Sequence, residues 1–295
     1  MFSSNETLAQ ARERNIQDAL REDLGTGDWT GRLIPEGRRV RAAVKVRENA
    51  VLAGRDWFDG CVLALDAKAR IVWRFDEGAD MPADAQVCEI EADARALLSA
   101  ERPALNFLQL LSATATTTRE HVRAIEGASP NPKGCAVLDT RKTVPGLRQA
   151  QKYAVRVGGG QNQRLALWHG MLIKENHIAA AGGVTAALAN AFALQSGVEI
   201  QIEVETLDQL REALAAGAQS VLLDNFGEPA MREAVAITAG RALLEVSGGV
   251  LLAQLRGIAA TGVDRISIGK LTKDVRAVDY SMRVLTAHPS AVPGR

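Results

Sequence analysis

The chain has 295 residues, 47% of them hydrophobic and 24% charged, which is the composition of a globular protein with one large domain or two medium ones. Its 35 basic residues balance its 35 acidic ones, and this balance argues against nucleic acid as the main partner. The amino terminus has no apolar signal-peptide core, and no stretch approaches about eighteen uninterrupted apolar residues. The three cysteines are widely spaced, which predicts buried thiols instead of disulfides or a zinc site. We therefore expect a cytoplasmic protein that does not enter a membrane.

The amino-terminal part of the chain predicts a layer of helices and strands. Helical spacing covers residues 5–22, and the turn-rich segment 23–28 contains two glycines that would end this helix. Further elements are expected as strands at 39–47, 71–75 and 86–91 and as a helix at 56–64. A longer apolar stretch with helical spacing runs from 94 to 126, where Pro103 predicts either a kink or the first turn of a second helix.

After Pro132 short apolar runs alternate with helix-length segments. The runs predict strands at residues 135–138, 171–173, 199–204, 220–223, 242–246 and 265–268, and amphipathic stretches predict helices at 207–216 and 229–239. This alternation implies a parallel sheet with right-handed crossovers, which could close as a barrel or stay open and doubly wound. We favour a (β/α) barrel because each run ends in a chemically distinctive residue, as expected around a single ring-shaped mouth.

Residues 140–174 hold seven Lys or Arg and no Asp or Glu, although the whole chain is neutral. The segment could be a solvated basic face, or it could line a pocket for a polyanion. The pocket is favoured because several of the bases stand beside apolar runs and glycines. The bases expected to point into the barrel mouth, where they suit a small dianion, are Arg141, Lys142, Arg164 and Lys174. Three others recur with helical spacing and are predicted to lie on a solvated helix face: Arg148, Lys152 and Arg156.

Glycines mark the tips of the last two expected strands, with Gly248 and Gly249 after one strand and Gly269 after the other. They could be simple turn glycines. Barrels commonly bind phosphate at this location, through exposed backbone N–H groups and the amino terminus of the following helix. The sequence therefore favours a phosphate site here.

Carboxylates mark two other expected strand tips. Glu203 and Glu205 are two apart on one strand and so face the same side, and Asp224 ends the next strand. They could be ordinary surface acids, but carboxylates beside a basic zone suit Mg²⁺ bridged to phosphates. Lys174 allows a further interpretation, because a lysine at a barrel strand tip can form a Schiff base with a carbonyl substrate.

Motifs along nearly the whole chain share a pattern with one known family. They include ERPALN at 101–106, LDTRKTVPGLR at 138–148, KYAVRVGGGQNQR at 152–164, LIKENHI at 172–178, IEVETLDQL at 202–210, LLDNF at 222–226, LEVSGG at 244–249 and IGKLT at 268–272. The set closely resembles the quinolinate phosphoribosyltransferase family, and LDTRKT followed by LIKENH is highly specific.

The resemblance implies a fold and a reaction. The fold is an α/β sandwich domain of residues 1–115, joined by the carboxy-terminal tail 274–295, and an incomplete (β/α) barrel of residues 116–273 that carries the active site. The reaction transfers phosphoribosyl from phosphoribosyl pyrophosphate to quinolinate, giving nicotinate mononucleotide, pyrophosphate and CO₂ with Mg²⁺, in de novo NAD synthesis. The family is usually dimeric.

The resemblance also implies roles for particular residues. The two quinolinate carboxylates would be clamped by Arg141, Lys142, Arg164 and Lys174, with Arg102 entering from a neighbouring subunit of a homodimer. Thr140 and Gln163 would complete the substrate-binding set. Mg²⁺ and the ribose or pyrophosphate would be held by Glu203 and Asp224, which with Lys142 and Lys174 form the catalytic set. The 5′-phosphate would be held by Ser247, Gly248, Gly249 and Gly269.

The chain departs from the family pattern at two positions. In the common motif GGGxxHR the residue before the arginine is His, but here it is Gln163, which donates a hydrogen bond and carries no charge. Lys273 stands near a position where relatives often have His. We expect activity to survive both changes. The alternatives are a related phosphoribosyltransferase acting on another acidic heterocycle, a Schiff-base lyase using Lys174, and a non-catalytic anion-binding protein.

Overall fold

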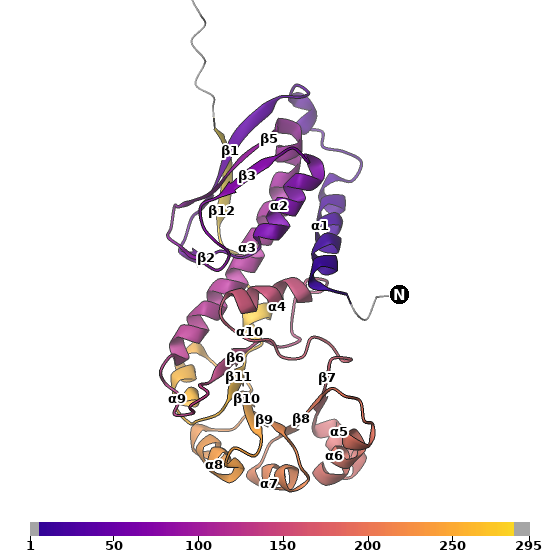
Figure 1. Ribbon diagram of the computed structural model, residues 1–295, viewed down its shortest axis with the longest axis vertical. Coiled ribbons are helices and arrows are strands. Elements are labelled where there is room, and N and C mark those ends of the chain that lie inside the picture. Colours follow the sequence, from indigo (N-terminus) through magenta and orange to yellow (C-terminus); the bar gives the residue numbers. More distant parts are fainter. Residues whose placement is uncertain (1–5, 286–295) are drawn as a thin grey trace, which may run out of the picture. The chain divides into compact units, whose positions relative to one another are not determined.

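The computed structural model describes residues 6–285, which form two compact units, and most of their helices and strands are labelled in Figure 1. Unit 1 contains residues 6–116, 145–158 and 275–285, and unit 2 contains residues 117–144 and 159–274. The sequence prediction assigned the whole of 116–273 to the barrel domain, so the segment 145–158 is a correction to it.

Unit 1 is built on an antiparallel sheet. Its four strands lie in the order β12-β1-β5-β3, with bounds Tyr280–Leu285, Arg39–Val46, Gln86–Asp93 and Arg70–Trp73. Val44 in the middle of β1 stands opposite Cys88 of β5 on one side and Met282 of β12 on the other. The shorter elements are β2 (Ala50–Val51), paired with β4 (Asp80–Met81), and the 3₁₀ turn Gly31–Leu33. Helices α1 (Leu8–Leu24) and α2 (Arg55–Leu65) pack against each other.

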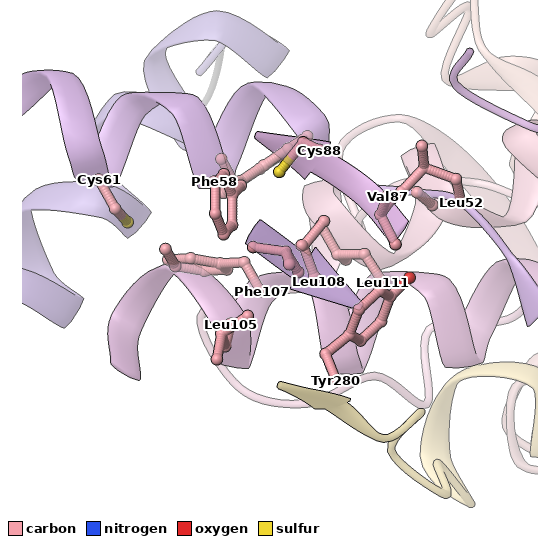
Figure 2. Packing of buried hydrophobic residues seen from close by; sticks show 14 of the residues in the cluster. Leu52, Phe58, Cys61, Val87, Cys88, Leu105, Phe107, Leu108, Leu111 and Tyr280 are labelled. Carbon is pink, nitrogen blue, oxygen red and sulfur yellow. The ribbon is translucent and has the colours of Figure 1, made fainter. Parts of the chain in front are cut away.

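The core of unit 1 lies between the sheet and its helices. Figure 2 shows Phe58 of α2, Cys88 of β5 and Leu108 of α3 (Ala94–Ile125) gathered in one cluster with Tyr280 of β12, and each of the four is at most 4% exposed. The Tyr280 hydroxyl shares a 2.8 Å hydrogen bond with Ser112, so burial of its aromatic ring leaves no polar atom unsatisfied.

Helix α3 (Ala94–Ile125) is a single helix that contributes residues to both units. It continues through Pro103, so the alternative of a second helix beginning at this proline is wrong. Apolar side chains of the helix are buried on both sides of Pro103. Their burial stabilises the helix by more than the loss of the one backbone hydrogen bond that proline removes.

Helix α4 (Arg148–Val157) corrects two predictions. Its Ala150 and Ala154 belong to the unit 1 core, which explains why the segment does not group with the parallel sheet. Arg156 is exposed as predicted for a solvated face, but Lys152 is only 3% exposed. Helical spacing shows that these residues share one face of the helix but not whether that face is exposed. The buried part of the α4 surface is wide enough to include Lys152.

Unit 2 contains the expected parallel sheet. Its strands lie in the order β6-β11-β10-β9-β8-β7, with bounds Ala136–Leu138, Arg265–Ser267, Leu243–Ser247, Ser220–Asp224, Glu199–Val204 and Gly170–Ile173. All neighbouring pairs are parallel, and in the described residues the two edge strands do not pair with each other. The intervening helices are α5 (Glu175–Ala181), α6 (Val184–Ala193), α7 (Leu207–Ala215), α8 (Glu228–Thr238), α9 (Leu255–Ala259) and α10 (Lys270–Lys273), with a 3₁₀ turn at Leu252–Gln254. An open six-stranded parallel sheet whose edge strands do not pair is the arrangement expected of an incomplete barrel.

The carboxy-terminal strand was not predicted from residue patterns. Residues 280–285 form β12, which pairs with β1 of unit 1 from Arg41 opposite Leu285 to Val46 opposite Tyr280. The rest of the expected tail, residues 286–295, lies outside the described residues. Among residues 6–285, no helix combines the length and apolarity needed to cross a membrane.

Asp59 in α2 provides a test of the unit 1 core. Its carboxylate accepts a 2.9 Å hydrogen bond from Trp73 Nε1, but burial raises the pKa of Asp59 to about 6. The pKa of Asp59 is higher in the folded state than in the unfolded state. The free energy of unfolding therefore falls as the pH rises from the unfolded pKa to the folded pKa, and it stays lower at any higher pH.

We expect Asp59→Asn, which still accepts the Trp73 hydrogen bond, to raise the free energy of unfolding by about 1–2 kcal/mol at about pH 8, after allowance for partial exposure, and by much less at about pH 4.5. Urea unfolding at the two pH values measures the difference. The exposed Asp23→Asn in α1 is the control and should change little. An equal gain at both pH values would contradict the burial argument.

Candidate active site

The carboxyl ends of the unit 2 strands surround a cavity of about 300 Å³. Side chains from six strands or from the segments that follow them form its wall, as expected at the mouth of a barrel. The lining residues are Thr140, Arg141, Lys142, Gln163, Arg164, Leu172, Lys174, Glu203, Leu222, Glu245, Ser247 and Ser267. The four bases predicted to face the mouth are therefore brought together.

The two arginines of this cavity are close enough to repel each other. Burial and the charge of Arg141 both lower the pKa of Arg164, whose Nη1 donates a 2.9 Å hydrogen bond to the carbonyl oxygen of Gly170. Lys142 is held by its main chain, since its N–H donates to Thr140 Oγ1 at 3.0 Å and its carbonyl accepts from Thr272 Oγ1 at 2.8 Å. Arg164 is thus held through its side chain and Lys142 through its main chain, at a site where an anion would relieve the repulsion between cations.

Lys174 and Glu203 form an ion pair on the same wall. Nζ of Lys174 lies 3.0 Å from Oε2 and 3.2 Å from Oε1 of Glu203. Burial raises the pKa of Glu203, the Lys174 contact lowers it, and the nearby charge of Asp224 raises it further. The site therefore places one carboxylate between the cationic cluster and a second carboxylate on the next strand.

The segment that carries Gln163 and Arg164 is anchored to the tip of β6. Asp139 is fully buried, and its carboxylate accepts hydrogen bonds from Asn162 Nδ2 at 2.6 Å and from the Gln163 backbone N–H at 3.0 Å. A buried carboxylate requires such donors. Asp139 therefore ties an irregular stretch of chain to a strand end.

The remaining predicted residues do not line the cavity. Asp224 pairs in register with Ser247 and accepts a 2.9 Å hydrogen bond from Asn225. Gly248 and Gly249 follow β10, and a Cβ added at Gly269 would lie 3.0 Å from Cδ of Lys142. These residues lie on the tips of β9, β10 and β11.

Three further residues named in the sequence analysis do not line the cavity. Arg102 lies in the unit 1 part of α3, and its entry into the site of a neighbouring subunit stays a prediction. Glu205 is exposed beyond the end of β8 and does not accompany Glu203. Lys273 is exposed and lies 3.4 Å from Asp274.

Three polar residues near the cavity were missed by the sequence analysis. Gln201, Glu245 and Ser267 are at most 4% exposed, and Glu245 and Ser267 line the cavity. Gln201 and Glu245 each precede a predicted site residue by two positions on a strand, and Ser267 precedes Gly269 by two. Because side chains two apart on a strand share a face, this alternation could have revealed them.

Two larger hollows lie elsewhere in unit 2. They have volumes of about 670 and 740 Å³ and share Leu243 and Asp264, which stand at the amino ends of β10 and β11. Catalytic residues of barrels come from the opposite, carboxyl ends of the strands. The smaller cavity is therefore the candidate active site.

Comparison with known proteins identifies the family. A model described as quinolinate phosphoribosyl transferase, C-terminal domain, matches residues 114–283, and one for the N-terminal domain matches residues 28–112. The chain belongs to this family. The family and the fold class expected from the sequence are thereby confirmed.

Individual relatives of the family match over nearly the whole chain. A probable nicotinate-nucleotide pyrophosphorylase (carboxylating) of Bacillus subtilis is 38% identical over 270 residues, which cover 91% of this chain and 92% of that protein. The Mycobacterium leprae nicotinate-nucleotide pyrophosphorylase (carboxylating) is 39% identical, with 92% and 96% covered. The solved structure of the nicotinate-nucleotide pyrophosphorylase from Francisella tularensis has a TM-score of 0.90 at 41% identity, with 97% of this chain and all of that chain covered.

The tip of β10 is a test of how closely the strand ends pack. Both glycines there have positive φ, but a Cβ at Gly248 would lie 2.4 Å from Oδ1 of Asn225, whereas a Cβ at Gly249 meets nothing within 4 Å. We expect Gly249→Ala to cost about 1 kcal/mol of unfolding free energy through backbone strain alone, and Gly248→Ala about 3 kcal/mol. Thermal melts of the two variants measure this order. Equal destabilisation would show that Asn225 moves away freely.

Proposed function

We propose that this protein transfers the phosphoribosyl group of phosphoribosyl pyrophosphate to quinolinate and releases pyrophosphate and CO₂, as a step of NAD biosynthesis. The observation that carries the proposal is the convergence of Arg141, Lys142, Arg164 and Lys174 on one cavity in a member of the quinolinate phosphoribosyltransferase family. A pyridine dicarboxylate has two negative charges on neighbouring carbons, and this cluster supplies several cations within one small volume.

The cationic cluster would hold the substrate by complementary charge. Arg141 and Arg164 offer planar forks that bind carboxylates through two hydrogen bonds, and Lys142 and Lys174 supply compact charges. Thr140 and Gln163, which line the same cavity, add neutral hydrogen-bonding groups. Arg102 belongs to this set if a second copy of the chain in a homodimer supplies it, since a cation from another subunit would close the clamp.

Two carboxylates suit a magnesium ion that arrives with pyrophosphate. In the described residues no group of three or more His, Cys, Asp or Glu side chains could hold a metal alone. Mg²⁺ commonly takes only one or two protein carboxylates and completes its shell with phosphates and water, so Glu203 and Asp224 fit this role. When bound, the ion would neutralise negative charge on the pyrophosphate leaving group.

The chain's own residues account for the rest of the reaction. As the anomeric C–O bond breaks, positive charge develops on the ribose, and the carboxylates of Glu203 and Asp224 would stabilise it. The clamp would hold the pyridine nitrogen against the anomeric carbon while Ser247 and the glycines after it receive the 5′-phosphate. Once alkylated, the ring nitrogen carries a positive charge that stabilises the carbanion left on the adjacent ring carbon when its C–C bond to CO₂ breaks. That carbon then takes up a proton from water, which gives the C–H bond of the product. Lys142 and Lys174 would keep the ring oriented during this step.

The alternatives have less support. A Schiff-base lyase needs a free amine, whereas both carboxylate oxygens of Glu203 lie within 3.2 Å of Nζ of Lys174. The family match and the paired carboxylates favour phosphoribosyl transfer over that chemistry. We retain the predicted cytoplasmic location as part of the proposal.

The reaction is tested by assaying pyrophosphate release with a panel of pyridine carboxylates. We expect turnover with quinolinate to exceed turnover with monocarboxylates, and we expect Asp224→Ala to remove it. Turnover with another acidic heterocycle but not with quinolinate would identify a related transferase. Quinolinate binding without turnover would identify an anion-binding protein.

The clamp is tested separately by calorimetry. Arg141→Ala should weaken quinolinate binding by about 30-fold or more, since removing one partner of a desolvated charge pair costs about 2 kcal/mol or more, while phosphoribosyl pyrophosphate binding changes little. Arg156→Ala, exposed on α4, is the matched control and should leave both ligands unaffected. Equal losses for both ligands in Arg141→Ala would contradict the assignment.

A further inference from the structure

Three buried or half-buried polar side chains form a continuous hydrogen-bonded chain, here called the amide relay. Gln163 Oε1 accepts from the backbone N–H of Arg164 at 2.6 Å, and Gln163 Nε2 donates to Gln201 Oε1 at 2.8 Å. Gln201 Nε2 in turn donates to Glu245 Oε2 at 3.0 Å. The amide relay therefore connects the segment that carries Arg164 to strands β8 and β10.

The direction of the amide relay is fixed at both ends. The Arg164 backbone N–H can only donate, so it selects the oxygen of Gln163. An ionised Glu245 can only accept, so it selects the nitrogen of Gln201 and leaves the oxygen of Gln201 for Gln163. The other neighbour of Gln201, the Ser220 hydroxyl at 3.2 Å, can donate or accept and does not choose an orientation.

The segment that the amide relay reaches has no regular structure of its own. Residues 162–164 belong to no helix or strand, so their position depends on side-chain contacts. Asp139 holds this segment from the tip of β6. The amide relay holds it from two other strands, one of which also carries Glu203.

We propose that Glu245, acting through Gln201, is a positioning residue that fixes the orientation of the Gln163 amide and the placement of Arg164 in the substrate clamp. The proposal rests on the proposed function, because it assigns these residues to the quinolinate end of that reaction. Gln163 is held as a neutral hydrogen-bonding group among cations. The orientation of the Gln163 amide is set by the Glu245 carboxylate, which reaches it through the hydrogen bonds of Gln201.

The burial of Glu245 supports a role that requires its charge. Its side chain is 1% exposed, Oε2 is bonded to Gln201, and Oε1 has no hydrogen-bond partner within residues 6–285. A neutral or apolar residue of the same size would avoid the cost of a half-satisfied buried carboxylate. Such a residue would also let the Gln201 amide turn over, and the Gln163 amide with it.

The proposal is tested by exchanging the residue types at positions 201 and 245, since Gln and Glu side chains are nearly equal in size. In Gln201→Glu two buried carboxylates face each other, and we expect the KM for quinolinate to rise at least about 10-fold while the KM for phosphoribosyl pyrophosphate stays within about 2-fold. In Glu245→Gln the acceptor is no longer obligatory, and a smaller rise of about 3-fold is expected. The double variant Gln201→Glu with Glu245→Gln restores a donor facing an acceptor, and the carboxylate introduced at position 201 would still accept from Gln163. We expect its KM to return to within about 3-fold of the wild type.

Two results would overturn the proposal. If the double variant is as impaired as Gln201→Glu, the charge acts from position 245 directly and not through Gln201. If the single variants keep the wild-type KM for quinolinate, the amide relay positions nothing. Should Gln201→Glu fail to fold in a thermal melt, Gln201→Met replaces it as the variant that fills the space without hydrogen bonds. If the wild-type enzyme is active but the double variant does not regain the wild-type KM, only this inference is wrong. If the wild-type enzyme shows no turnover, the proposed function is wrong as well.

Discussion

Repulsion between like charges is the constraint on which the active end of unit 2 depends. Arg141 and Arg164 lie close enough for one to lower the pKa of the other, and two lysines share their cavity. Like charges stay this close together only if contacts with the surrounding structure hold their side chains in place. The carbonyl oxygen of Gly170 holds Arg164, and Glu203 holds Lys174. The anionic substrate then supplies the remaining counter-charge, so binding and charge compensation are the same event.

The sequence predicts the strands and the cationic tips because both are local properties. A run such as Ser220–Asp224, with three consecutive apolar residues, is apolar enough to indicate a buried strand, and the residues after each run emerge at one edge of a parallel sheet. Lys152 was misplaced because helical spacing cannot tell how many sides of α4 are covered. Strand β12 was missed because its burial depends on pairing with β1, which is far away in the chain. Glu245 was missed because only its alternation with Ser247 indicates the face on which it lies, and its partner Gln201 belongs to a different strand.

The amide relay proposed above bears on Gln163, the position where the family resemblance led us to expect His. A histidine at this place could carry a charge, whereas Gln163 keeps the same neutral state at every pH and needs partners that set its orientation. Gln201 and Glu245 are such partners, contributed by two strands that also carry Glu203 and Ser247. The rigid part of the sheet thus determines the geometry of an irregular segment, as preorganised binding sites require.

The most direct measurement is a crystal structure of the protein with quinolinate bound. We predict that both carboxylates lie in the cavity at the carboxyl ends of the strands, each within hydrogen-bond distance of at least one of Arg141, Lys142, Arg164 and Lys174. Quinolinate bound at the amino ends of β10 and β11, or over Gly248 and Gly249, would contradict it.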